Sequence, residues 1–400
     1  MVKLYAAFTK ELDNPEAAVR EITEQLKPSE TVLKNAVGIV QFYYEYTETG
    51  VYEALVEALP FDLVGCATTS IGASGRYGDL AMSVTLITSD DVNFTVRTFH
   101  DMDKKSREII TEETTLLFAE LSKSEKPKMV LSFMSMYQHF SGDDLIAAAD
   151  ALPETLPLFG TLAFSDEGRQ EANVVVSGGE ISSNIMAFIA FYGNFEPKFR
   201  IHTAFDYDEA FGEDAEITDA DGAVLKTVNG MSSVDFLIKQ GVITDRSVIT
   251  GDTNVVGSIP AILTRQDGSK VARAFLGLVD GEPDYVYSAG HIDVGSKISF
   301  SCMDSEKTLL GAEKLMTDIS ASNERNFIAF SCAARAWSFG SLYLDEVKKM
   351  AQSYEKYRKT NMPIEYCISY SAGEICPIVN MNGKLVNALH NYSLISCSFD

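Results

Sequence analysis

The hydrophobic and polar positions of the chain alternate between two patterns. Short, continuous apolar runs bounded by turn residues are typical of buried strands, and apolar residues spaced by three and four are typical of helices with one buried face. An order of strand, helix and strand occurs three times, with a turn of small residues and a further strand or hairpin after each second strand. The predicted units are Val37–Tyr44, Thr49–Leu59 and Phe61–Thr69; Met129–Met134, Gly142–Leu152 and Leu156–Phe164; and Asn326–Cys332, Asp345–Lys359 and Ile364–Ser371.

Hairpins and helix starts are marked by local sequence. Gly178-Gly179 and Asn382-Gly383 supply the positive φ that tight hairpin turns require. Asp13 and Pro15 open a first helix, because an Asx cap and a proline in the first turn favour helix initiation. A β-α-β unit followed by antiparallel strands predicts an α+β fold. We expect mixed, largely antiparallel sheets built from repeated β-α-β-β units, with helices packed on the outer faces.

Two long helices are expected to bridge the repeated units. They span Lys104–Leu121 and Ser305–Ile319, and their apolar residues predict core packing. After the apolar run Ile185–Tyr192 the pattern breaks at residues 193–197, and an acidic stretch follows. Because a chain of 400 residues exceeds one typical core, we expect two domains, 1–195 and 196–400.

Charge excludes several classes of partner. The chain carries 57 acidic and 33 basic residues, a formal net charge of −24. Nucleic-acid binding depends on Lys and Arg that displace counterions, so we expect no nucleic-acid partner and no attraction to anionic membranes. The longest apolar run falls far short of a membrane span, and the first ten residues lack the apolar core of a secretory signal. The sequence therefore predicts a soluble, cytoplasmic protein without membrane insertion.

The six cysteines are scattered and form no C-x-x-C pair. Zinc and thioredoxin chemistry therefore have no support in the sequence. We expect reduced, buried thiols, since a free cysteine behaves as a small hydrophobe, and no metal site.

Several motifs arrive in an order that resembles a known family. Leu63–Thr69 with the following Gly-rich turn resembles the Gly-Cys-Ser-Thr region of the FIST N-terminal domain. Phe327–Arg335 is similar to the Ser-Cys-x-x-Arg strand of the FIST C-terminal domain, Ser371–Pro377 to its Gly-Glu-Ile turn, and Asn391–Leu394 to its closing Asn-x-Thr-Leu strand. The resemblance extends from about residue 30 to the end. It departs from the family at Thr69-Ser70-Ile71-Gly72, where relatives carry Ala-Gly-Glu-Ile and hence an acidic group.

The resemblance implies a bacterial sensory module that binds a small molecule, with amino acids as proposed ligands. FIST domains are often fused to kinase, cyclase or chemotaxis output domains, and this chain has no room for one. We therefore expect it to signal through a separate partner, such as a histidine kinase or a cyclase.

The residues themselves suggest how an amino acid would bind. Arg335 and Glu374 stand at predicted strand ends, where an arginine would grip a carboxylate with two hydrogen bonds and a glutamate would take the ammonium. Asn391 would orient either group, and Tyr370 and Trp337 would wall the pocket. The alternative is a buried Arg–Glu ion pair that only fixes the loops. The full candidate set is Arg335, Glu374, Asn391, Tyr370, Trp337, Ser371, Cys332, Thr68, Thr69 and Arg76.

The Gly-rich segment Gly72–Gly78 is not a phosphate-binding loop. It matches neither G-x-G-x-x-G nor the Walker A pattern, and no helix pattern follows it. We expect a hairpin or pocket rim there, with Arg76 at its tip in reach of an anionic ligand.

Three other functions stay open. An enzyme would use Cys332 as the nucleophile with His390 as its base, although a catalytic thiol needs an electropositive, partly exposed setting. A haem-binding gas sensor would need an axial ligand, for which His390 or His139 is the candidate; otherwise we expect no cofactor. An interaction scaffold without a small ligand is the third alternative. We expect a binding protein rather than an enzyme.

Overall fold

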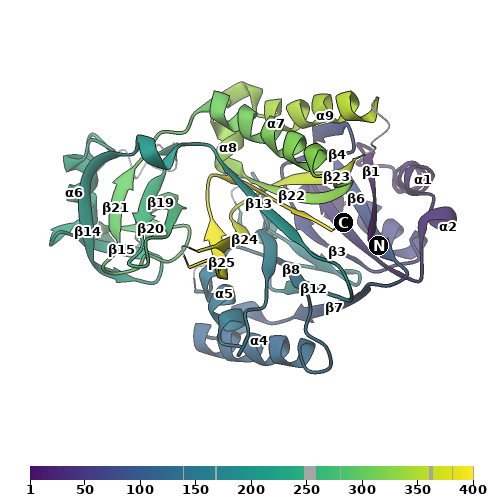
Figure 1. Cartoon of the computed structure of the whole chain (residues 1–400), viewed down its shortest axis with the longest axis horizontal. Coiled ribbons are helices and arrows are strands. Elements are labelled where there is room, and N and C mark those ends of the chain that lie inside the picture. The colour runs from purple at the N-terminus through teal and green to yellow at the C-terminus, as the bar shows by residue number, and fades with distance from the viewer. Residues whose placement is uncertain are drawn as a thin grey trace.

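The computed structural model describes residues 1–137, 139–166, 169–246, 258–279, 281–359, 364–380 and 382–399 (Figure 1). Its core consists of three six-stranded sheets, and a separate body of strands lies to one side. The three sheets have the same strand order, so the core consists of three topologically equivalent repeats.

The first repeat comprises the first strands and helices of the chain. They are β1 (Lys3–Thr9), α1 (Pro15–Leu26), α2 (Pro28–Thr31), β2 (Asn35–Phe42), α3 (Val51–Ala58), β3 (Leu63–Ala67), β4 (Ser70–Ala73), β5 (Arg76–Asp79) and β6 (Met82–Ser89). The Asn14 side chain caps α1 by accepting from the Ala17 N–H at 3.0 Å. Strands β2 and β3 are parallel, as the sequence predicts for a β-α-β unit.

The second repeat has the same order. It contains β7 (Asn93–Phe99), α4 (Arg107–Leu121), β8 (Met129–Met134), α5 (Gly142–Asp150), β9 (Leu158–Leu162), β10 (Val175–Ser177), β11 (Glu180–Ser182) and β12 (Met186–Tyr192). Strands β8 and β9 are parallel. Gly160 of β9 and Gly65 of β3 occupy the same place, because a Cβ there would meet the neighbouring strand at 2.4 Å from Ser132 O and 1.7 Å from Val40 O.

The third repeat is interrupted by an insertion. It contains β13 (Lys198–Thr203), α7 (Ser305–Ala321), β22 (Asn326–Cys332), α8 (Ala333–Trp337), α9 (Asp345–Arg358), β23 (Glu365–Ser371), β24 (Glu374–Val379), β25 (Leu385–His390) and β26 (Ser393–Ser398). Strands β22 and β23 are parallel. Asp304 caps α7 by accepting from the N–H groups of Glu306 and Lys307. All three predicted strand–helix–strand units are therefore confirmed.

The insertion lies between β13 and α7 and forms its own strand-rich domain, which we call the inserted domain (residues 205–303). It contains β14 (Phe211–Asp221), β15 (Val224–Val228), β16 (Met231–Ser232), α6 (Ser233–Lys239), β17 (Ala261–Thr264), β18 (Lys270–Arg273), β19 (Phe275–Val279), β20 (Glu282–Ser288) and β21 (Lys297–Phe300). All the strand pairs in this domain are antiparallel. The domain has its own apolar core, and it is the body at the left of Figure 1. The sequence pattern did not predict this insertion.

Each core sheet is completed by a hairpin from another repeat. The sheet orders are β1-β6-β2-β3-β10-β11, β7-β12-β8-β9-β24-β25 and β13-β26-β22-β23-β4-β5. The β4–β5 hairpin of the first repeat therefore joins the third sheet, β10–β11 of the second joins the first, and β24–β25 of the third joins the second. This cyclic exchange ties the three repeats into one body.

The three sheets share one apolar core, and helices cover their outer faces. The central core draws residues from all three sheets and includes Phe133 and Phe330, whose rings lie 6.2 Å apart edge to face. The outer faces pack against α1 and α3, against α4 and α5, and against α7 and α9. The predicted α+β class with outer helices is confirmed. The domain boundary near residue 195 falls between β12 and β13 and stays a prediction.

None of the described helices combines the length and the apolar character required to cross a lipid bilayer.

The inserted domain should be removable, because its two ends meet. The Asp304 N–H donates to Ala204 O at 2.9 Å, so a short Gly-Ser linker can replace residues 205–303. We expect the remaining chain to fold with native-like far-UV circular dichroism and cooperative urea unfolding, at reduced stability. As a control, replacing the much smaller β4–β5 hairpin (residues 70–79) should abolish cooperative unfolding, since it uncovers an edge of the third sheet. The reverse result would contradict the assignment of core and insertion.

Candidate ligand-binding site

A buried arginine joins the inserted domain to the core. Arg273, at the end of β18, is fully buried, and its Nη2 donates to both carboxylate oxygens of Asp143 at 3.2 Å. Its Nη1 donates to Leu389 O at 2.9 Å and its Nε to His291 O at 3.0 Å. Asp143 lies in the first turn of α5 and Leu389 lies in β25, so one side chain links the inserted domain to two core repeats.

A second polar cluster lies beside it. Asp144 forms a capping box with Ser141 at the start of α5, and its Oδ1 accepts from Arg107 Nε at 2.6 Å. His291 Nε2 of the inserted domain lies 3.3 Å from Asp144 Oδ2. Burial opposes the charged form of Asp144, but the hydrogen bonds from His291, the Ser141 N–H and Arg107 outweigh it and lower its pKa to about 2. The carboxylate therefore stays charged and fixes this edge of the interface.

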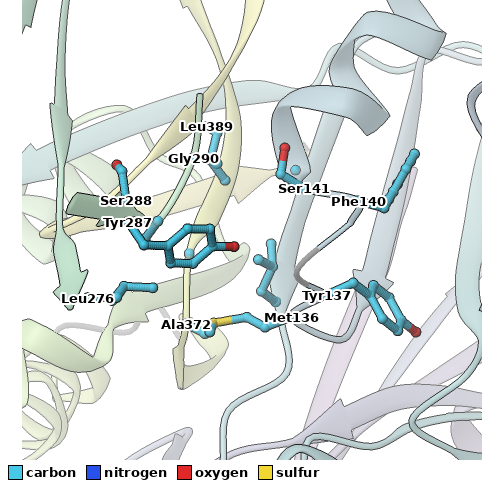
Figure 2. A pocket seen from close by; sticks show the side chains of 14 residues that line it. Met136, Tyr137, Phe140, Ser141, Leu276, Tyr287, Ser288, Gly290, Ala372 and Leu389 are labelled. Atoms are coloured by element: carbon cyan, nitrogen blue, oxygen red, sulfur yellow. The ribbon is translucent and has the colours of Figure 1, made fainter. Parts of the chain in front are cut away.

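The first cavity, which we call cavity 1, opens next to these clusters and has a volume of about 190 Å³ (Figure 2). It is lined by Met136, Tyr137, Phe140, Ser141, Gly142, Leu162, Leu276, Tyr287, Ser288, Ala289, Gly290, Ala372, Gly373 and Leu389. These residues come from the core and from the inserted domain, and none of them carries a charged side chain. Figure 2 shows the ring of Tyr287 reaching from the inserted domain toward Met136 and Ala372. Cavity 1 is thus a largely apolar cavity at a domain interface.

The fold explains why these segments meet. Met136 and Tyr137 follow the carboxyl end of β8, and Leu162 ends the parallel strand β9. Loops after parallel strands converge at one edge of a sheet, where ligands commonly bind. The β23–β24 turn reaches the same edge because the β24–β25 hairpin completes this sheet, with the Ala372 N–H donating to Leu162 O.

A second cavity, cavity 2, has a volume of about 400 Å³ and lies at the carboxyl ends of β2, β3 and β22. Its lining residues are Tyr43, Thr69, Ser70, Asp79, Leu80, Phe164, Asp166, Ala333, Ala336, Trp337, Gly340 and Tyr343. Trp337 and Thr69 belong to the candidate set that the sequence suggested. The structure places both of them on the wall of one cavity.

The predicted placement of Arg335 is corrected by the structure. Arg335 lies in α8 rather than at a strand tip, and its guanidinium is fully buried. Its Nε and Nη2 donate to the carboxylate of Glu346, its Nη1 donates to His202 O at 3.2 Å, and its Nη2 also donates to Thr308 O at 3.1 Å. Every nitrogen of the guanidinium thus has a protein acceptor. Arg335 forms a buried structural ion pair, which is the alternative that the sequence left open, but its partner is Glu346 rather than Glu374.

Glu374 does not pair with Arg335, contrary to the ion-pair alternative that the sequence left open. Its Oε1 accepts a hydrogen bond from the Ser371 hydroxyl, whereas its buried Oε2 has no hydrogen-bond partner among the described residues. Burial raises the pKa of Glu374 well above its usual value, against opposing contributions from Ser371 and Arg335. Burial thus favours the neutral form of the carboxyl, which lines neither cavity 1 nor cavity 2.

Three other candidate residues make internal contacts. The Thr68 hydroxyl donates to Tyr370 O at 2.8 Å and accepts from the Tyr370 N–H at 3.1 Å. The Tyr370 pKa is raised well above its usual value by burial and by the Glu346 carboxylate. Asn391 accepts from the Ala274 N–H at 3.1 Å and so holds the inserted domain. These residues shape the interface, and neither cavity 1 nor cavity 2 includes them in its wall.

The surroundings of Cys332 and His390 do not support the enzyme alternative. Burial raises the pKa of the Cys332 thiol, with Glu374 adding to the effect, which is the opposite of what activates a nucleophile. The proposed base, His390, is buried with its Nε2 3.1 Å from Cys376 O. All six cysteines are free; five are buried, but Cys302 is exposed, so the expectation of burial is wrong for that residue.

The haem alternative stays a prediction. His139 is exposed, with its Nε2 2.9 Å from Met102 O, and neither it nor His390 lines cavity 1 or cavity 2. Among the described residues, no group of three or more His, Cys, Asp or Glu is arranged to hold a metal ion. Arg76 is exposed on β5 and donates to Gln25 Oε1.

Sequence reasoning missed the residues that build the interface. Glu346 carries a usable signal, because it shares the buried stripe of α9 with Met350 and Ser353, and a charged residue on an apolar stripe requires a partner. Arg273 and Tyr287 carry no comparable signal. They lie in a domain whose position relative to the core is set by tertiary contacts alone.

Small-molecule sites occur preferentially at domain interfaces, and cavity 1 lies at one. In a comparison with family models, the FIST N domain matches residues 37–231 and the FIST C domain matches residues 248–377. These matches cover most of the chain, which therefore belongs to the FIST family, whose domains act as sensors in signal transduction. The comparison with curated proteins gave no match.

Breaking the buried ion pair should be costly. Arg335→Met leaves the Glu346 carboxylate buried without its cation, and we expect a loss of about 3–5 kcal/mol in the free energy of unfolding. Lys349→Met is the matched control, because its pair with Glu313 is partly exposed and should contribute less than about 1 kcal/mol. Urea unfolding measures both. A loss at Arg335 no larger than that of the control would show that the pair is not a structural element.

Buried histidine should make the fold acid-sensitive in a defined window. Burial lowers the pKa of His390 to about 4, against about 6.5 in an unfolded chain, so the unfolded state alone takes up a proton between these values. The stability contributed by the neutral form is complete above pH 6.5 and is lost as the pH falls toward 4. We expect His390→Gln to flatten the stability–pH slope in this window, by up to about 3 kcal/mol in total.

Two features make this measurement specific. Exposed His100, in the matched variant His100→Gln, should leave the slope unchanged. Asp144 titrates lower, since its pKa of about 2 places its loss of stability below pH 4. An unchanged slope in His390→Gln would show that His390 titrates normally in the folded protein.

Proposed function

We propose that this protein is a sensor that binds a small, uncharged and largely apolar molecule in cavity 1. The main observation behind this proposal is that one apolar cavity is lined by residues of both the core and the inserted domain. Membership of the FIST family supports a sensory role. The ligand state is passed to a separate signalling partner, such as a histidine kinase or a cyclase.

The lining supports a ligand of this chemistry. A volume of about 190 Å³ is somewhat larger than the roughly 150 Å³ of an engineered apolar cavity that binds benzene, so one substituted aromatic ring or a compact aliphatic molecule fits. The Tyr287 hydroxyl forms no hydrogen bond with a described residue and is directed toward the cavity in Figure 2. Burial raises the pKa of Tyr287, so this hydroxyl stays neutral and can donate to the ligand.

An amino acid fits this cavity less well. Its carboxylate and ammonium would be buried without charged partners, which costs several kcal/mol or more. The cation that the sequence offered for the carboxylate, Arg335, is occupied by Glu346. We therefore propose an uncharged ligand in place of the amino acid that the family resemblance suggested.

Signal transmission follows from the position of the cavity. A ligand that contacts Leu276 and Tyr287 on one side and Met136 and Leu389 on the other favours the arrangement in which the two bodies are closed. It shifts the equilibrium by no more than the difference of its affinities for the two arrangements. The Arg273–Asp143 contact lies at the same interface and supports the closed arrangement. The free thiols support a reducing compartment, and we propose the cytoplasm.

Aromatic probes test the proposal. We expect benzene and phenol to raise the melting temperature in a saturable way, whereas benzoate, of similar size but charged, should not. Ala289→Leu fills cavity 1 and should abolish both shifts, while Ala58→Leu, the same change on the exposed end of α3, should leave them intact.

A second variant tests the polar contact. Tyr287→Phe should weaken phenol binding about fivefold to tenfold, the value of one hydrogen bond, and leave benzene binding unchanged. Calorimetry or a thermal-shift titration measures this ratio. Binding that persists undiminished in Ala289→Leu would place the ligand outside cavity 1 and overturn the proposal.

A further inference from the structure

Cavity 2 is a second candidate site, and its chemistry differs from that of cavity 1. Four aromatic side chains stand in its wall: Tyr43, Phe164, Trp337 and Tyr343. The rings of Phe164 and Trp337 meet edge to face with their centroids 6.1 Å apart, so their positions are mutually fixed. They come from connections that follow β2, β9 and β22, and thus from all three repeats.

Two carboxylates complete the wall of cavity 2. The Tyr343 hydroxyl donates to Asp79 Oδ2, which leaves Oδ1 without a hydrogen bond from any described residue. Asp166 is exposed, and within the described ranges neither aspartate forms an ion pair with a basic residue. The described part of the lining contains no Lys, Arg or His. The nearby guanidinium of Arg169 lies over the Tyr44 ring, outside the lining.

The aromatic faces are accessible. Trp337 is 55% exposed, which is unusual for the largest apolar side chain, and Leu80 and Tyr343 beside it are also exposed. The hydrogen bond to Asp79 and burial raise the pKa of Tyr343 to about 12, so its ring stays neutral and holds the carboxylate in place. The exposed indole of Trp337 thus lies in the same wall as two carboxylates that form no ion pair with a described basic residue.

We propose that cavity 2 binds an organic ammonium ion, a primary or methylated amine on a small apolar body. A cation is attracted to the face of an indole or phenol ring within about 6 Å of its centroid, and tryptophan is the most favourable of these rings. Asp79 and Asp166 supply opposite charge, and an N–H donor would form a charge-assisted hydrogen bond with Oδ1 of Asp79. Anions and zwitterions are disfavoured, because their negative groups would meet two carboxylates and no cation. This site is independent of the ligand proposed for cavity 1.

The chain provides its own reporter, because Trp337 is its only tryptophan. Titration of the full chain with choline at constant ionic strength should change the tryptophan emission in a saturable way. The neutral molecule 3,3-dimethyl-1-butanol has the same shape without the charge, and we expect it to bind at least tenfold more weakly. Equal binding of the two probes would overturn the proposal, as would an emission that choline leaves unchanged.

Three variants assign the interaction to its groups. Asp166→Asn and Asp79→Asn should each weaken choline binding about threefold to tenfold, and Asp166 is exposed, so its replacement leaves the fold intact. Asp62→Asn removes the same charge at the opposite end of β3 and should have no effect. Trp337→Leu, followed by calorimetry, should lose at least tenfold, and Trp337→Phe should lose less.

The outcomes separate this site from the first. Ala289→Leu, which fills cavity 1, should leave choline binding unchanged. If choline binding survives the double replacement of Asp79 and Asp166, the carboxylates do not hold the cation and the proposal fails. If Ala289→Leu abolishes choline binding, the cation occupies cavity 1 and the proposal likewise fails.

Discussion

The exchange of hairpins between repeats is the constraint on which the arrangement of the core depends. Each β-α-β unit sends its following hairpin to the edge of a neighbouring sheet, so that β4 pairs with β23, β10 with β3 and β24 with β9. The crossing points are fixed by hydrogen bonds: the Thr68 hydroxyl serves Tyr370 as both donor and acceptor, and the Leu162 N–H donates to Gly373 O while the Ala372 N–H donates to Leu162 O. No sheet has its full set of strands without a second repeat. The loops at the carboxyl ends of the strands are therefore held by two repeats at once, and they form cavity walls with little freedom of their own.

The inserted domain adds a second constraint, since it is attached through buried polar contacts rather than through a shared sheet. Arg273 reaches Asp143 and the Leu389 carbonyl, and Asn391 accepts from the Ala274 N–H. Contacts of this kind are strong when complete and costly when broken singly, so they favour one closed arrangement over a continuum of positions. Cavity 1 lies within this interface, which is why its occupancy and the position of the inserted domain are physically linked.

The sequence predicted local structure well and tertiary partners poorly. Periodicity located all three strand–helix–strand units, and the Asx cap expected for the first helix is supplied by Asn14. A buried ion pair of Arg335 was one of the alternatives, but its partner was not predicted, because Glu346 lies on the next helix and the carbonyl acceptors lie on β13 and α7. The inserted domain was not predicted, because its Asp-Gly turns indicate only local hairpins. Trp337 and Thr69, two of the candidate residues, lie on the wall of cavity 2, whose described lining contains two aspartates and no basic residue.

The strand plan shows how two different cavities arise from one design. Glu374 of β24 lies opposite Thr161 of β9, and Ile71 of β4 lies opposite Ser369 of β23, so the strand plan makes Glu374 and Ile71 equivalent, as the aligned family motif does. At the first position, burial favours the neutral form of the Glu374 carboxyl, and the described lining of the neighbouring cavity 1 carries no charged side chain. At the second position the acid is absent, and a carboxylate, Asp79, lies on the neighbouring strand β5 at the wall of cavity 2. The departure from the family motif at Ile71 thus coincides with a carboxylate at the wall of a cavity rather than in the interior.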